Sequence, residues 1–92
     1  MGAKMNLIDE LSTSYLNISA DLELAKNLEG HYIEVTETIA RLNALIDSGY
    51  LDEDELFEFA RLGYQYFRLK DALVSAMIVK KQSDNNDSNS HI

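Results

Sequence analysis

The sequence predicts an all-α protein, either an antiparallel helical hairpin or a three-helix bundle. Apolar residues recur at helical spacings of three and four along most of the chain, and no stretch shows the two-residue alternation of a strand. The 92 residues include no proline and only four glycines, so few positions interrupt a helix. One clear turn signal, at residues 47–51, separates two patterned halves. The expected unit is a single helical domain over residues 1–82.

The best-defined helix starts at Asp52 and runs to about Lys81. Asp52 is a good N-cap residue, and Glu55 three positions later completes a capping box. The acidic residues of the first turn favour the positive end of the helix dipole, and Lys80 and Lys81 favour its negative end. Local sequence alone therefore predicts both ends of this second helix of the hairpin.

Two apolar seams run along this predicted helix, on different sides of it. The first seam consists of Phe59, Leu62, Tyr66, Leu69, Leu73 and Ala76. The second seam consists of Leu56, Ala60, Gly63, Phe67, Val74 and Ile78. One neighbouring helix covers only one such stripe. The second seam therefore predicts another packing partner, which would be a third helix of the same chain or a second molecule, and we expect a homo-oligomer, most simply a dimer.

The first half of the chain allows two models. One apolar stripe runs from Ile8 to Ile46, with a single irregular step near Leu28 and a glycine at Gly30. In the first model, one long helix spans about residues 6–47. In the second, the chain breaks at Gly30 and His31 into two helices, which gives the bundle a third element. The sequence after Gly30 offers no good N-cap, and this favours the long helix.

The two ends of the pattern have distinct signals. Asp47, Ser48 and Gly49 predict a helix end, because Gly49 can adopt the left-handed conformation beyond the last turn. The short turn from Ser48 to Leu51 makes the flanking helices antiparallel neighbours. Residues 83–92 are polar and without periodicity, so we expect them to form a disordered tail.

The composition restricts the classes of partner. A formal net charge of −8 argues against binding nucleic acid or anionic membrane, both of which need clustered Lys and Arg, and favours a protein partner with a basic surface. No apolar run is long enough to cross a bilayer, so no membrane association is expected and a cytoplasmic location is the default.

The residues needed for catalysis or metal binding are scarce. There is no cysteine, and the only histidines are His31 and His91, far apart in the sequence. A calcium loop around Gly49 would place Ala44 and Ile46 at ligand positions, where oxygen donors are required. We therefore expect no enzyme activity, no metal and no cofactor.

The remaining interpretation is a small acidic helical module for protein–protein interaction, such as an adaptor, a chaperone or an inhibitor. Aromatic residues next to arginines are typical of interface hot spots. The second helix holds such a set, and we expect it to bind the partner. The predicted partner-binding residues are Phe57, Arg61, Tyr64, Tyr66, Arg68, Leu69 and Leu73. The alternatives are an acidic nucleic-acid mimic that blocks a DNA-binding protein and a purely structural oligomerisation module.

Overall fold

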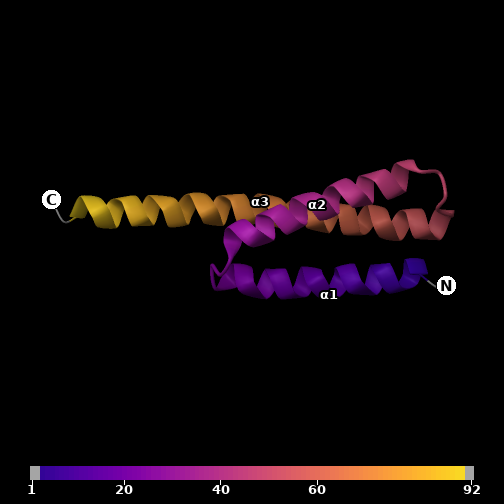
Figure 1. The fold of residues 1–92 in the computed structure, drawn as a ribbon, viewed down its shortest axis with the longest axis horizontal. Coiled ribbons are helices and arrows are strands. Elements are labelled where there is room, and N and C mark those ends of the chain that lie inside the picture. The colour runs from indigo at the N-terminus through magenta and orange to yellow at the C-terminus, as the bar shows by residue number, and fades with distance from the viewer. Residues whose placement is uncertain (1–2, 91–92) are drawn as a thin grey trace.

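The computed structural model describes the backbone of residues 3–90 and the side chains of residues 6–83. Within this part of the chain there are three α-helices and no strand: α1 (Ala3–Glu23), α2 (Leu28–Asp47) and α3 (Glu53–Ser90). Figure 1 shows that α1 and α3 run in the same direction, α2 runs in the opposite direction, and α3 extends beyond the other two helices. The structure confirms the all-α prediction in its three-helix form.

The long helix over residues 6–47 was the wrong choice between the two models. The chain leaves α1 after Glu23 and starts α2 at Leu28, three residues before the predicted break at His31. Between the helices, Ala25 and Asn27 adopt left-handed backbone conformations, with φ angles of 52° and 53°. Asn tolerates this region better than most residues do, and it occupies the N-cap position of α2. The reversal therefore depends on Asn27 rather than on a glycine.

Gly30 is nevertheless linked to the reversal through the Asn27 side chain. A Cβ atom added at Gly30 would lie 2.6 Å from the side-chain oxygen of Asn27 and 2.8 Å from its side-chain nitrogen. Asn27 makes no side-chain capping hydrogen bond, so its amide instead lies over the first turn of α2. The glycine predicted to break the helix thus lies inside α2 and leaves room for the residue at the break.

The turn between α2 and α3 confirms the sequence prediction. Gly49 has a φ of +80°, the left-handed conformation expected after a helix end. The Asp52 side chain accepts a 2.8 Å hydrogen bond from the backbone N–H of Glu55. The Glu55 side chain in turn accepts a 3.0 Å hydrogen bond from the backbone N–H of Asp52. This reciprocal pair is a complete capping box, and it fixes the start of α3.

The core lies between the first seam of α3 and the two shorter helices. Five members of that seam are buried, and α1 and α2 supply the remaining buried apolar side chains. The buried apolar residues are Ile8, Ile18, Leu28, Val35, Leu42, Phe59, Leu62, Tyr66, Leu69 and Leu73. Both short helices therefore share a single face of α3.

This sharing leaves the second seam of α3 uncovered. Leu56, Phe67 and Ile78 keep 39%, 50% and 53% of their surface exposed. The third helix that a chain break provides was a candidate to cover this seam, but α1 instead packs beside α2 on the first seam, where Tyr15 meets Tyr66 edge to face. An apolar strip on α3 thus remains at the surface of the single chain.

The predicted tail overlaps the end of α3. The helical backbone runs to Ser90, and the side chains from residue 84 onward lie outside the described part of the chain, as do residues 91–92 entirely. The disorder expected for residues 83–92 stays a prediction. Across the described residues, no helix has the length and apolar character that crossing a membrane requires.

Candidate protein-interaction surfaces

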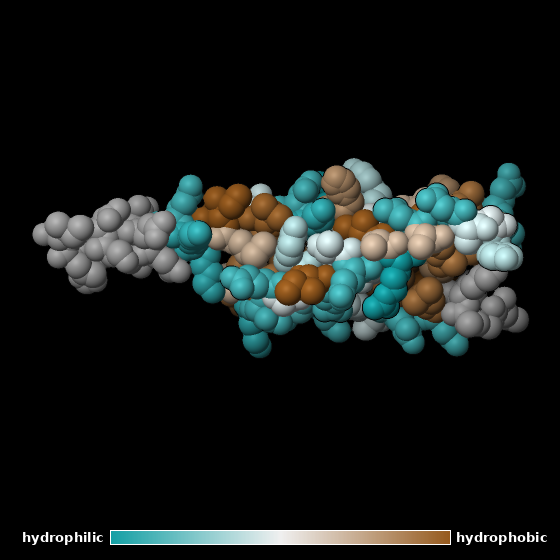
Figure 2. Space-filling model, turned by 45° about the horizontal axis from the view of Figure 1, so that its top comes forward, coloured by the Kyte–Doolittle hydropathy of each residue, from teal (hydrophilic) through white to brown (hydrophobic). Residues whose placement is uncertain are grey.

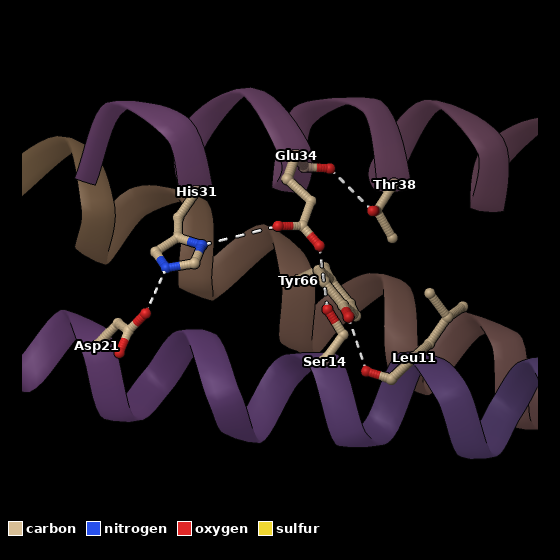
Figure 3. Close-up of polar contacts among 7 residues, drawn as sticks. All are labelled: Leu11, Ser14, Asp21, His31, Glu34, Thr38 and Tyr66. Carbon is tan, nitrogen blue, oxygen red and sulfur yellow. Dashed lines mark hydrogen bonds and ion pairs between the residues drawn. The ribbon is translucent and has the colours of Figure 1, made fainter. Parts of the chain in front are cut away.

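A cluster of polar side chains connects α1 to α2 (Figure 3). His31 Nε2 lies 2.8 Å from Asp21 Oδ2, across the α1–α2 reversal. The other ring nitrogen, Nδ1, is buried and makes no hydrogen bond, and the Glu34 carboxylate lies 3.7 Å from it. Only 13% of the His31 side chain is exposed. The imidazole therefore lies between two carboxylates, one from each helix.

Glu34 extends this cluster toward the middle of the bundle. Its carboxylate accepts a 3.2 Å hydrogen bond from the Ser14 hydroxyl on α1, while its backbone carbonyl accepts one of 2.8 Å from Thr38. The Ser14 hydroxyl thus donates to Glu34 and not to His31. A serine nucleophile would need the opposite arrangement, with the imidazole next to the hydroxyl. The contacts are those of a clamp that holds α1 against α2.

Tyr66 provides the matching contact between α1 and α3. Its hydroxyl donates a 2.7 Å hydrogen bond to the backbone carbonyl of Leu11. Burial raises the pKa of the phenol above its ordinary value of 10.0, the Ser14 hydroxyl acts in the opposite direction, and the charge of Glu34 raises the pKa further. The phenol is therefore held in its neutral, hydrogen-bond-donating form.

Four of the seven predicted partner-binding residues lie on the surface of α3. Phe57 and Tyr64 are 68% and 63% exposed. The Arg68 guanidinium lies 5.8 Å from the centre of the Tyr64 ring, a cation–π geometry, and Arg61 forms a 2.8 Å ion pair with Glu58. At about 100° per residue, these four side chains leave the helix on one side. We call Phe57, Arg61, Tyr64 and Arg68 the aromatic–arginine face.

The other three predicted residues lie inside the bundle. Tyr66, Leu69 and Leu73 are 0%, 4% and 0% exposed. They belong to the first seam, and α1 and α2 cover them, so a partner could reach them only if the bundle opened. Their burial agrees with a packing role within the chain. Partner binding by the four exposed residues stays a prediction.

Sequence reasoning missed the clamp around His31. In a continuous helix, Asp21 and His31 would stand about 15 Å apart along the axis, too far for any contact. Only the reversal at residues 24–27 brings them together. The one available signal was the spacing of His31 and Glu34, which share a helix face at three residues apart.

Comparison with known proteins returned no match to a protein-family model, a curated protein or a solved structure. Among the residues with described positions, no group of three or more His, Asp or Glu side chains is arranged to hold a metal ion.

Proposed function

We propose that this protein is a small acidic interaction module, an adaptor, chaperone or inhibitor, that binds a protein partner through the aromatic–arginine face of α3. The observation that carries the proposal is the exposure of Phe57 and Tyr64 next to two arginines. Large aromatic and arginine side chains often supply most of the binding free energy at protein interfaces. Exposed apolar patches on a chain without a partner lower its solubility. We further propose that the protein acts in the cytoplasm, which agrees with its lack of cysteine.

The surroundings of the aromatic–arginine face favour a partner that presents both an apolar side chain and basic residues. The ring of Tyr64 and the side chain of Arg68 border a groove between α1 and α3, whose wall on α1 includes Tyr15 and Leu22. Phe57, at the other end of the face, stands one turn from the acidic start of α3 at Glu53 and Asp54. An apolar partner side chain would fit the groove, and basic residues of the same partner would meet the acidic turn.

The test compares the chain with two altered forms as baits in extracts of its native host. We expect Phe57→Ala combined with Tyr64→Ala to lose the partner, with an affinity reduced at least about tenfold when the purified partner is titrated. The matched control is Leu16→Ala combined with Ile33→Ala, which removes two exposed apolar side chains from α1 and α2. Equal recovery of the partner by the unaltered chain and by both altered forms would contradict the proposal.

The same purified partner distinguishes an adaptor from a nucleic-acid mimic. A mimic places its carboxylates where phosphates bind, so DNA would displace it from the partner and added salt would weaken the complex steeply. Binding through the aromatic–arginine face predicts that DNA does not compete and that salt has a weak effect. Displacement by DNA would replace our proposal with the mimic.

A further inference from the structure

The second seam of α3 is a separate apolar strip from the aromatic–arginine face. At about 100° per residue, its members Leu56, Ala60, Gly63, Phe67, Val74 and Ile78 fall within about 60° of one another around the helix. The groove between α1 and α3 is lined instead by Gln65, Arg68 and Ala72, on the other side of α3. Figure 2 shows apolar side chains, in brown, exposed over the C-terminal part of α3 next to the grey residues. This strip has no covering element within the chain.

Gly63 lies inside α3, about three turns from its start, and the single chain gives no reason for a glycine there. A Cβ atom added at Gly63 would meet nothing within 4 Å, and its backbone has no left-handed φ. Glycine inside a helix is less stable than alanine by about 1 kcal/mol. A glycine on the open strip is explained if another helix approaches the backbone closely at this point.

Charge is strongly segregated along the same helix. Within α3, residues 53–60 contain four acidic side chains and no basic one, whereas residues 61–83 contain five basic side chains and one acidic. Glu53 and Asp54 lie at the turn end of α3, and Lys80 and Lys81 lie about 40 Å away along its axis. The strip therefore has an acidic end and a basic end, so its charges complement those of an inverted copy of itself.

We propose that two copies of this chain pair through the second seam of α3, with their α3 helices antiparallel. A two-fold axis at Phe67 makes the register self-consistent, because Leu56 and Ile78 are each eleven positions from it. The same axis brings Glu53 opposite Lys81 of the other copy, and at about 100° per residue both side chains lie at the edges of the strip. Leu56 then meets Ile78, Ala60 meets Val74, Gly63 meets the short side chain of Asp71 at the edge of the strip, and the two Phe67 rings meet each other at the centre.

The energy and the orientation of this pairing come from different groups. Covering the apolar strip supplies the stabilisation, as in any helix pair packed at the usual small crossing angle. The charged pairs at the ends are exposed, where ion pairs contribute little energy, but a parallel arrangement would place like charges together. Charge therefore selects the antiparallel form. This pairing leaves the aromatic–arginine face of both copies outside the interface, so it does not depend on the proposed partner.

The first test is the mass of the purified chain in solution, measured by light scattering and by sedimentation over a range of concentrations. We expect a dimer whose dissociation constant rises more than about 100-fold in Phe67→Glu, because both copies place the charge at the axis. Phe67 is half exposed in the single chain, so this change leaves the helices folded by circular dichroism. The control, Phe57→Glu on the neighbouring face, keeps the dimer.

The second test determines the direction of the pairing with engineered cysteines, since the chain contains none of its own. Mild oxidation should cross-link the Phe67→Cys variant to itself at the axis. Leu56→Cys should not cross-link to itself, but it should cross-link to Ile78→Cys when the two variants are mixed. Self-linking of Leu56→Cys without linking to Ile78→Cys would show a parallel pair and overturn the proposed register.

A third test exchanges the charges at the two ends. The Lys81→Glu variant and the Glu53→Lys variant should each dimerise about tenfold more weakly than the unaltered chain. Mixed together, they should form a heterodimer with restored affinity, because both ends then pair opposite charges. A monomer mass for the unaltered chain at every concentration would overturn the proposal, even if the partner of the aromatic–arginine face were found.

Discussion

The hydroxyl of Tyr66 on α3 donates a 2.7 Å hydrogen bond to the backbone carbonyl of Leu11 on α1, across fifty-five positions of sequence. It joins the two parallel helices of the bundle at the level of the core, where the ring of Tyr15 also packs against Tyr66. The phenol must stay protonated to donate this bond. The docking of α1 therefore depends on a group that titrates at high pH.

The protein should lose stability at alkaline pH because of Tyr66. Burial raises its pKa above 10.0 in the folded state, whereas the unfolded chain has the ordinary value. Above about pH 10 the unfolded state releases this proton first, so the free energy of unfolding falls as pH rises, until the pH passes the folded pKa. Urea unfolding followed by circular dichroism from neutral to alkaline pH measures the slope.

The matched variant for this prediction is Tyr66→Phe, which keeps the ring and removes the hydroxyl. At neutral pH we expect it to be less stable by about 1 kcal/mol, because one buried hydrogen bond is lost. Above pH 10 the gap between the two proteins should narrow. Tyr50→Phe, at an 82% exposed ring, controls for the other tyrosines. A gap that stays constant with pH would show that the phenol does not contribute in this way.

The Asp21–His31 contact should stabilise the docking of α1 on α2. Asp21→Ala leaves His31 Nε2 without its partner 2.8 Å away in a mostly buried site, and such a loss costs about 1–3 kcal/mol. Glu23→Ala, on the same turn of α1 and exposed, should change the free energy of unfolding by less than about 0.5 kcal/mol. Hydrogen exchange should show faster exchange in α1 for Asp21→Ala, and equal losses in both variants would contradict the clamp.

The capping box gives a third prediction, at the other end of the bundle. Asp52→Ala removes the acceptor of the Glu55 N–H, and this should cost about 0.5–2 kcal/mol. Asp52→Asn keeps an oxygen acceptor at the same place and should cost much less. Thermal unfolding of the two variants measures the difference. Equal destabilisation would assign the effect to charge at the helix end instead of to the hydrogen bond.

The features predictable from the sequence are those set by neighbouring residues. The Asp52–Glu55 box and the conformation of Gly49 involve a few consecutive positions, and the existence of two apolar seams on α3 follows from its periodicity alone. The choice of seam was not predictable in this way. Both seams of α3 are apolar, and only the packing of α1 next to α2 decides which one is covered. For the same reason, Tyr66 and Leu69 of the first seam could not be separated from Phe67 of the second as interior and surface.

The reversal between α1 and α2 escaped sequence analysis for a different reason. The residues that turn the chain are Ala25 and Asn27, and alanine favours helices more than any other residue. Gly30, the residue that favours a break, lies in the first turn of α2. Packing overrides propensity here: the reversal lets Ile8 and Ile18 of α1 enter the core next to α3. The stabilisation that comes from burying these two side chains cannot be recognised from local sequence patterns.

Ala25 provides the sharpest test of the three-helix fold against a continuous helix. In the structure Ala25 has a φ of 52°, a conformation that costs a residue with a Cβ about 1 kcal/mol and costs glycine nothing. Ala25→Gly should therefore raise the free energy of unfolding, by somewhat less than about 1 kcal/mol because glycine also makes the unfolded chain more flexible. In a continuous helix the same change would lower it by about 1 kcal/mol. The sign of the change in melting temperature distinguishes the two folds, with Ala40→Gly, in the middle of α2, as the control that must destabilise in either case.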